Sequence, residues 1–333
     1  METLPEKPSE NDCCGSGCNP CIFDIYEKLL KTHKSGNISS SSSVKIRYDL
    51  LSPLKYKPFI LLNIQKENAN CNIYTFKPVI VCNDVTNDFN GNEQSNFTTN
   101  DTTLKTIVDE CINGILPYLP GQHVIMKNVK MVCNRNFENV NTASLSRSYT
   151  PVSLAQKEEN CVMKLLIKLY DNEKMSSFIS QLKLFDIVFF RGPFGDFRHI
   201  KNSKYFMICA GTGLAPMYPI IKTILLNEED ESIVRLCFAC QTFEDILFRE
   251  EIRYFSKFWN FKARIYLSRE STNDFNNRIR YEERIHLQKL TNDALQKQLR
   301  NERFKILICG SESFNKCMTN YVEKLGYTDI FVF

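Results

Sequence analysis

The sequence predicts a mixed β and α/β fold, in which an antiparallel β-barrel precedes an α/β domain with a parallel sheet. Two observations predict it. Over residues 56–200, short β-branched and aromatic runs alternate with turn residues, a pattern typical of a small antiparallel barrel. After residue 201, continuous apolar runs alternate with helical patterns, which indicates buried parallel strands connected by helices.

The N-terminal segment is a cysteine cluster followed by a helical pattern. The apolar residues of 21–31 share one helical face, and the serine-rich stretch 35–43 is a flexible linker by composition. We therefore expect a cysteine-rich module at 1–34 and a linker at 35–55. Thiolates are ligands for zinc and for iron–sulfur centres, although the spacing is standard for neither. The candidate metal ligands are Cys13, Cys14, Cys18 and Cys21.

The barrel domain is expected at 56–200. The runs that predict its strands are 59–65, 73–81, 123–126, 161–170 and 187–191. The segment 83–106 is rich in Asn, Thr, Asp and Ser and has no apolar period, so we expect a disordered surface insertion there.

The α/β domain is expected at 201–333. Its predicted buried strands are 205–209, 233–238 and 304–309. The last of them precedes apolar residues that repeat at helical spacing from Phe314 to Leu325, which predicts a C-terminal helix.

Composition sets the class of protein. The chain has 333 residues, 43% of them hydrophobic, and a formal net charge of +4. That length favours two domains and a tail, and the small charge argues against nucleic acid as a partner. No apolar run approaches the roughly 20 residues of a membrane span, and the polar, acidic start resembles no targeting peptide. We expect an intracellular, cytoplasmic monomer, with association with an organelle left open.

The strongest local signal is the segment 146–151, which reads Ser-Arg-Ser-Tyr-Thr-Pro. Arg147 offers a fork of donors that suits a phosphate. Tyr149 provides a flat face, and Thr150 provides a short hydroxyl for a ring nitrogen. For the segment taken alone, a strand end followed by a turn is the preferred interpretation.

The neighbouring segments strengthen the phosphate interpretation. In 161–170, alternation places Leu166, Lys168 and Tyr170 on the strand face opposite the apolar one. A helical pattern then starts at 174–177, and the free N–H groups of a helix start favour an anion such as a pyrophosphate.

The second domain carries glycines where its first strand meets a helix. Gly211 and Gly213 allow backbone to approach a dinucleotide closely. We place Pro219 in the first turn of that helix, where a missing N–H does no harm. Because ligands bind beyond the carboxyl ends of parallel strands, Cys309 and Gly310 are expected at the mouth of the site.

Together these motifs resemble the cytochrome b5 reductase branch of the ferredoxin–NADP reductase superfamily, over residues 59–333. The family pattern runs R-x-Y-T-P, V-x-K-x-Y, G-K-M-S, G-P-x-G, G-T-G-x-x-P and C-G-P-x-x-M, and the chain follows it with some substitutions. The resemblance implies FAD and a nicotinamide dinucleotide as cofactors. It implies cofactor binding by Arg147, Ser148, Tyr149, Thr150, Leu166, Lys168, Tyr170, Lys174, Met175, Ser176, Gly211, Thr212, Gly213, Pro216 and Gly310, and catalytic positions at Thr150, His123 and Cys309.

The N-terminal segment resembles a short oxidoreductase-like domain that precedes the reductase in the cytochrome b5 reductase-like subfamily. Within the body, the chain departs from the family pattern. Glu173 replaces the glycine of G-K-M-S and adds negative charge beside the expected pyrophosphate. The position where relatives carry an acidic residue for the NADH ribose is Ser268, followed by Arg269. An arginine there is typical of NADP-using relatives, which makes NADPH the alternative donor. The overall match to the family favours NADH, and NADH is therefore the expected donor.

The resemblance implies an FAD-dependent reductase of the cytochrome b5 reductase type. Hydride passes from NADH to the flavin, and electrons then pass to an acceptor such as cytochrome b5, a small haem protein. Two alternatives stay open. One is a reductase of the same fold that delivers electrons to a quinone, a ferric chelate or a metal bound by the tail. The other is a non-catalytic interaction protein with a decayed reductase body.

Overall fold

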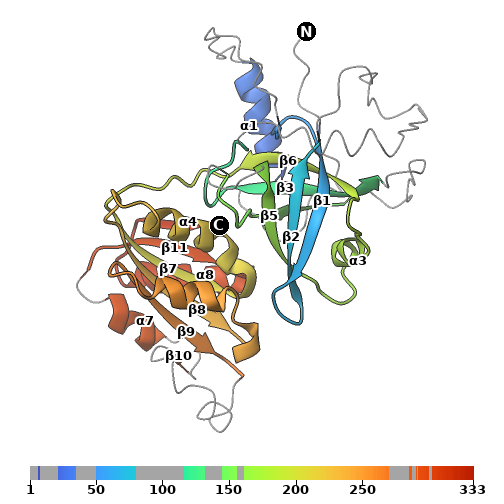
Figure 1. The fold of residues 1–333 in the computed structure, drawn as a ribbon. Coiled ribbons are helices and arrows are strands. Elements are labelled where there is room, and N and C mark those ends of the chain that lie inside the picture. The colour runs from blue at the N-terminus through green and yellow to red at the C-terminus, as the bar shows by residue number, and fades with distance from the viewer. Residues whose placement is uncertain are drawn as a thin grey trace.

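Both predicted sheets are present, and they lie next to each other (Figure 1). The structure is a computed structural model. It describes residues 7, 22–34, 50–79, 116–131, 145–155, 161–269, 285–286, 290, 292–299 and 302–333. The mixed β and α/β fold class is confirmed.

The first sheet is antiparallel and closes on itself. In spatial order its strands run β4, β3, β6, β1, β2, β5. The two outer strands meet through an antiparallel bridge between Pro151 and Leu165, where Val152 N donates to Lys164 O at 2.8 Å. The strands are β1 (Lys57–Lys66), β2 (Cys71–Pro78), β3 (His123–Met131), β4 (Ser146–Tyr149), β5 (Met163–Lys168) and β6 (Ile187–Phe194).

The alternation of side chains along β5 follows the sequence pattern. Met163, Leu165 and Ile167 lie in the barrel core, whereas Leu166 lies in the core of the second domain. Successive residues of a strand point to opposite faces, so β5 contributes to both cores.

The observed barrel elements differ from the predicted ones mainly at their ends. β2 ends at Pro78, before the predicted end at 81, and β6 continues to Phe194, beyond 191. Leu50 and Leu51, which we assigned to the linker 35–55, are buried in the barrel core. The barrel domain therefore begins by residue 50. The predicted insertion 83–106 lies outside the described residues.

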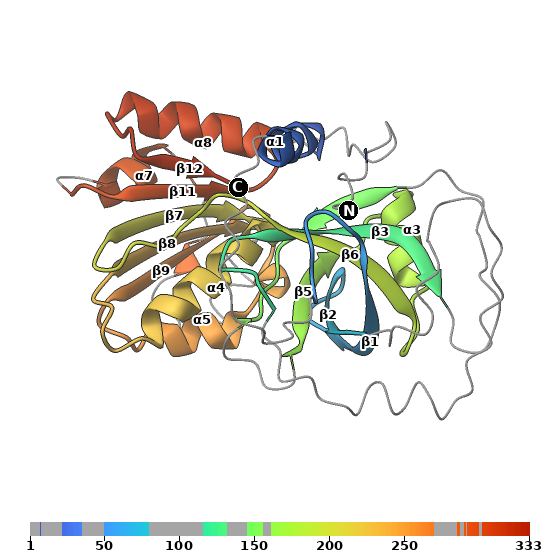
Figure 2. The ribbon, with the colours of Figure 1, turned by 90° about the horizontal axis from the view of Figure 1, so that it is seen from above.

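The second sheet is parallel throughout and has helices on both faces (Figure 2). Its order is β10, β9, β8, β7, β11, β12. The strands are β7 (Lys204–Ala210), β8 (Ile233–Cys240), β9 (Phe261–Leu267), β10 (Ile285–His286), β11 (Lys305–Cys309) and β12 (Ile330–Val332). The helices are α4 (Leu214–Leu225) and α5 (Arg249–Phe255) on one face, and α7 (Asn292–Leu299) and α8 (Glu312–Lys324) on the other.

One expectation for α4 was wrong. The helix begins at Leu214, so Pro219 lies in its second turn and not in the first. Pro219 fits helical φ, but it loses the i−4 hydrogen bond and its ring crowds the carbonyl of residue i−4. Nearly all of α4 is buried, and its packing compensates for the missing bond.

The two domains share packed contacts. In the hairpin between β1 and β2, the Glu67 carboxylate accepts a hydrogen bond from Phe248 N of the second domain at 2.7 Å. Cys71 and Leu166 pack into the same core as α4. Gly121 has a φ of +85°, and a Cβ there would press on the ring of Phe333 at 3.0 Å. The C-terminal residue therefore lies against a barrel turn.

The N-terminal helix α1 (Ile22–Lys34) lies beside the segment that follows β6. Lys28 Nζ is 3.3 Å from an Asp196 carboxylate oxygen, and both side chains are 73% exposed. An ion pair this exposed contributes little to stability. Among the described residues, no helix is long and apolar enough to cross a membrane.

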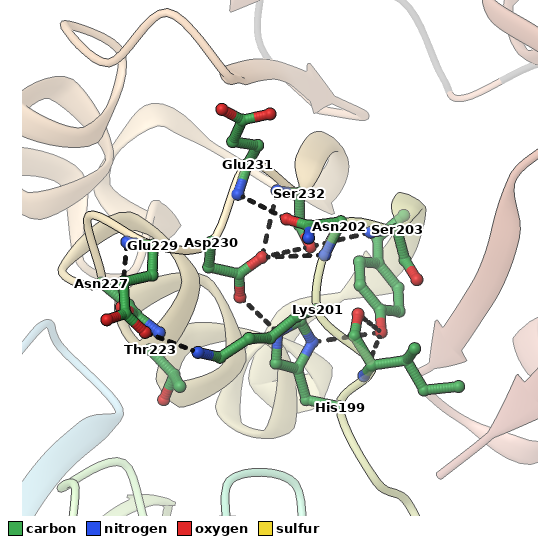
Figure 3. A network of polar contacts seen from close by, with 12 residues as sticks. His199, Lys201, Asn202, Ser203, Thr223, Asn227, Glu229, Asp230, Glu231 and Ser232 are labelled. Carbon is green, nitrogen blue, oxygen red and sulfur yellow. Dashed lines mark hydrogen bonds and ion pairs between the residues drawn. The ribbon is translucent and has the colours of Figure 1, made fainter.

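A polar network fixes the segment between the domains (Figure 3). His199 Nε2 lies 2.5 Å from Asp230 Oδ2, and His199 Nδ1 lies 3.1 Å from the Tyr205 hydroxyl. The other Asp230 oxygen accepts hydrogen bonds from Asn202 N, from Ser232 N and from the Ser232 hydroxyl. Burial alone would raise the pKa of Asp230, but these hydrogen bonds hold it below its usual value.

Replacing Asp230 with alanine is expected to destabilise the protein by about 2–4 kcal/mol, because several donors lose a charged acceptor in a buried place. The folded pKa lies below the unfolded value of about 3.9. The contribution is therefore complete above that pH and is lost as pH falls through the folded pKa. Calorimetric melting from pH 7 down to pH 3 measures both effects. Glu231→Ala, an exposed neighbour, is the control, and equal melting of the two variants would contradict the prediction.

Candidate functional site

The two groups of predicted site residues meet where the domains touch. β5 contacts the turn Gly211–Gly213 at the carboxyl end of β7. Leu166 of β5 belongs to the same core as Leu214, the first residue of α4. The structure therefore brings the barrel motifs and the glycine turn into one site.

Strand β4 presents Arg147 and Tyr149 on one face and Ser148 on the other. The register pairs Arg147 with Met126 and Tyr149 with Val124, both of which are core residues. Ser148 is exposed. Burial raises the pKa of the Tyr149 hydroxyl, and the nearby Glu173 carboxylate raises it further. The Tyr149 hydroxyl is therefore neutral at neutral pH.

The guanidinium of Arg147 has partners within the protein. Nη1 donates to the Ser146 carbonyl at 2.9 Å, and Nη2 lies 3.2 Å from Glu173 Oε1. The side chains of Arg147 and Glu173 are 26% and 34% exposed. The ion pair therefore lies at the edge of the barrel, partly open to water.

Helix α3 (Lys174–Ser180) begins differently from our expectation. Its N-cap is Glu173, whose Oε2 accepts a hydrogen bond from Ser176 N at 2.6 Å. Ser177 N donates to the Glu173 carbonyl at 2.9 Å. The N–H groups of Ser176 and Ser177, which we expected to be free for an anion, are therefore engaged by Glu173.

The other predicted residues around α3 are divided between core and surface. The Met175 side chain is buried in the barrel core, so it presents no side chain to a ligand. The Ser176 hydroxyl accepts a hydrogen bond from Tyr170 N at 3.0 Å. Tyr170 is 55% exposed, and Lys168 Nζ lies 5.3 Å from the centre of its ring.

His123 and Thr150 adjoin at the ends of their strands. The register pairs Val124 with Tyr149, and His123 and Thr150 are the next residues beyond that pair. The His123 ring is 5.8 Å from the Phe194 ring. Burial lowers the pKa of His123 to about 4, so the imidazole is neutral near pH 7.

On the second domain, the site lies where the strand order reverses. β7 has β8 on one side and β11 on the other, so the glycine turn after β7 and Gly310 after β11 adjoin. A Cβ on Gly213 would collide with the carbonyl of Cys309, whereas a Cβ on Gly211 would meet nothing within 4 Å. Gly213 therefore packs two strand ends together, and Gly211 borders open space.

The remaining predicted residues of this domain lie at the same edge of the sheet. Burial raises the pKa of the Cys309 thiol to about 12, so it stays a neutral thiol. Pro216 is buried in α4, and Thr212 is half-buried. Ser268 and Arg269 follow β9 with exposed side chains, and their N–H groups donate to the carbonyls of Cys240 and Gln241 at 3.1 and 2.9 Å.

The candidate metal ligands Cys13, Cys14, Cys18 and Cys21 lie outside the described residues. The contact between Phe333 and Gly121 was not predicted, and neither was the ion pair of Glu173 with Arg147. Two signals pointed to that pair: both residues were expected beside the pyrophosphate, and Glu173 is an acidic residue one position before a helix, where an acid favours capping.

Comparisons with known proteins agree with this arrangement. The family model described as an oxidoreductase FAD-binding domain matches residues 96–199, and the oxidoreductase NAD-binding domain matches residues 207–320. The N-terminal family of oxidoreductase-like proteins matches residues 2–39. The resemblances drawn from the sequence are confirmed, and the chain has domains for FAD and for NAD.

Similar proteins are found over nearly the whole chain. The "NADH-cytochrome b5 reductase-like" protein of Homo sapiens is 30% identical over 333 residues, which cover 99% of this chain and 93% of that protein. The protein of the same name from Mus musculus is 30% identical over 347 residues, with 99% and 94% covered. The cytochrome b5 reductase domain of Ulva prolifera nitrate reductase has a similar fold, with a TM-score of 0.63, 21% identity, and 85% of this chain and 99% of that chain covered.

The residues present fit both cofactors. The Arg147 guanidinium and Ser176 N–H converge on one carboxylate, a donor set that suits the phosphates of FAD. The open space beside Gly211 and the close packing at Gly213 suit a dinucleotide that lies near the backbone.

Proposed function

The chain belongs to the NADH-cytochrome b5 reductase-like family, and on that premise we propose that it takes hydride from NADH onto FAD and passes electrons to a small haem protein such as cytochrome b5. The observation that carries the proposal is the contact of β5 with the turn Gly211–Gly213. It supports the proposal because hydride transfer requires the flavin side and the nicotinamide side of the site to adjoin.

Bound FAD would supply acceptance of hydride and release of single electrons. On the barrel side, Arg147 would hold the pyrophosphate, and Tyr149 and Leu166 would help to hold the rest of FAD. Thr150 and the neutral His123 offer polar groups at the strand ends without adding a charge. The further residues proposed to bind FAD are Ser148, Lys168, Tyr170, Lys174, Met175 and Ser176, with Met175 contributing through its backbone because its side chain is buried.

On the nicotinamide side, backbone and neutral groups determine the fit. Gly211, Thr212 and Gly213 line the approach of the dinucleotide, and Pro216 holds the first turn of α4. Cys309 and Gly310 lie next to this turn. Burial keeps the Cys309 thiol neutral at neutral pH, so it adds no charge to the pocket.

Rapid mixing of the purified, yellow protein with NADH tests the proposed function. We expect NADH to bleach the flavin absorbance at least as fast as the enzyme turns over. Added cytochrome b5 should then be reduced. Faster reoxidation by a quinone or a ferric chelate than by cytochrome b5 would assign a different acceptor. A colourless protein that binds no added FAD would favour an interaction protein.

NADPH is a second candidate donor, because Arg269 is exposed at the end of β9. If Arg269 meets the 2′-phosphate, Arg269→Ala should lower kcat/KM for NADPH about ten- to a hundredfold and leave NADH nearly unchanged, since a charge-assisted hydrogen bond contributes about 1.5–3 kcal/mol. Ser268→Asp should also suppress NADPH use by repulsion. Unchanged NADH/NADPH ratios in both variants would mean that the ribose binds elsewhere.

A further inference from the structure

Glu173 makes two contacts that an incoming phosphate would also seek. One oxygen pairs with Arg147 Nη2 at 3.2 Å, and the other accepts the hydrogen bond of Ser176 N at 2.6 Å. We propose that Glu173 determines the affinity of the flavin site for FAD, because its carboxylate competes with the pyrophosphate for Arg147 and for Ser176 N. This inference rests on the proposed placement of the FAD pyrophosphate at Arg147.

Arg147 gives Glu173 one N–H group of Nη2, out of the five that a guanidinium carries. Its other terminal nitrogen, Nη1, donates to the Ser146 carbonyl at 2.9 Å. Bidentate binding of a phosphate uses two guanidinium N–H groups in parallel. A pyrophosphate that binds at the Nη2 edge of Arg147 therefore competes with the carboxylate for that edge and for Ser176 N.

The charge of Glu173 makes this a competition between anions. Burial alone would raise its pKa, but hydrogen bonds from Ser176 and the charge of Arg147 lower it below the usual value. The carboxylate is therefore ionised at neutral pH, and it repels a phosphate that enters beside it. Both side chains are partly exposed, so water weakens the pair and Glu173 can be displaced.

Glu173 also stabilises the site in the absence of FAD. Its carboxylate caps α3 and joins that helix to β4. Removal of the carboxylate should therefore lower the stability of the flavin-free protein and raise its affinity for FAD. Removal of a residue with only a structural role would lower both the stability and the affinity.

The test is titration of the flavin-free, full-length protein with FAD, followed by flavin fluorescence. Glu173→Gln keeps the size of the side chain and an oxygen for Ser176 N but removes the charge. We expect its Kd for FAD to fall roughly tenfold, equivalent to about 1.4 kcal/mol, and Glu173→Gly to bind FAD at least as tightly as the wild type. Glu228→Gln changes an exposed acid in the turn after α4 and controls for net charge.

Two further measurements make the result specific. Riboflavin lacks phosphate, so its affinity should be the same for the wild type and for Glu173→Gln. The melting temperature of flavin-free Glu173→Gly should be lower than that of the wild type, because the cap and the ion pair are lost. A fall in melting temperature together with tighter FAD binding is the expected signature.

The outcomes separate this inference from the proposed site. If Arg147→Ala weakens FAD binding but both Glu173 variants bind FAD no more tightly than the wild type, the pyrophosphate placement stands and the role of Glu173 is refuted. If Arg147→Ala also leaves FAD affinity unchanged, the placement itself is wrong and both proposals fall.

Discussion

Replacing Arg147 with alanine is expected to reduce FAD affinity by roughly a hundredfold or more. Hydrogen bonds to charged groups contribute about 1.5–3 kcal/mol each, and a bidentate contact with a phosphate uses two of them. The variant also leaves the Glu173 carboxylate without the partner that lies at 3.2 Å in the wild type. That unpaired charge would then repel the phosphate. The measurements are the ratio of flavin to protein after purification and the Kd for FAD.

Arg147→Lys is the matched control for this prediction. It retains the positive charge but lacks the planar fork, so its FAD affinity should lie between those of the wild type and Arg147→Ala. Equal affinities of the lysine variant and the wild type would show that charge alone suffices. Full flavin occupancy in Arg147→Ala would place the pyrophosphate elsewhere.

The Gly213→Ala variant should both destabilise the second domain and slow the reduction of the flavin by NADH. A Cβ at this position would collide with the Cys309 carbonyl, and backbone cannot rotate away as a flexible side chain can. We expect a loss of about 1–3 kcal/mol in stability from overpacking. Because a shift of about 1 Å in a catalytic geometry costs about a hundredfold in rate, NADH-driven flavin reduction should fall by a similar factor. Rapid-mixing kinetics and thermal melting measure the two effects.

Gly326→Ala separates the collision from the general effect of a methyl group on a glycine. Gly326 has a φ of +87°, and a Cβ there meets nothing within 4 Å. Alanine should therefore cost about 1 kcal/mol of backbone strain and leave flavin reduction unchanged. Wild-type reduction kinetics in Gly213→Ala would show that the strand ends can move apart without harm to the site.

Local patterns in the sequence determined the order of the domains and the faces of the strands. The alternation that put Leu166 opposite Met163, Leu165 and Ile167 reappears as membership of two different cores. Such patterns are readable because the period of a strand is set by its own backbone. The glycine turn Gly211–Gly213 was likewise found from the sequence, since it directly follows a buried apolar run.

Only the tertiary structure decided which charged groups meet. Arg147 and Glu173 are 26 positions apart in the chain, and they pair because closure of the barrel between Pro151 and Leu165 brings β4 beside β5 and α3. Phe333 lies against Gly121 because β12, which precedes it, pairs with β11. The sequence by itself determined the residue types that suit FAD and NADH, because each motif is local. The negative charge of Glu173 beside the pyrophosphate was expected from its motif, but its pairing with Arg147 became visible only in three dimensions, because no local period relates two side chains on separate elements.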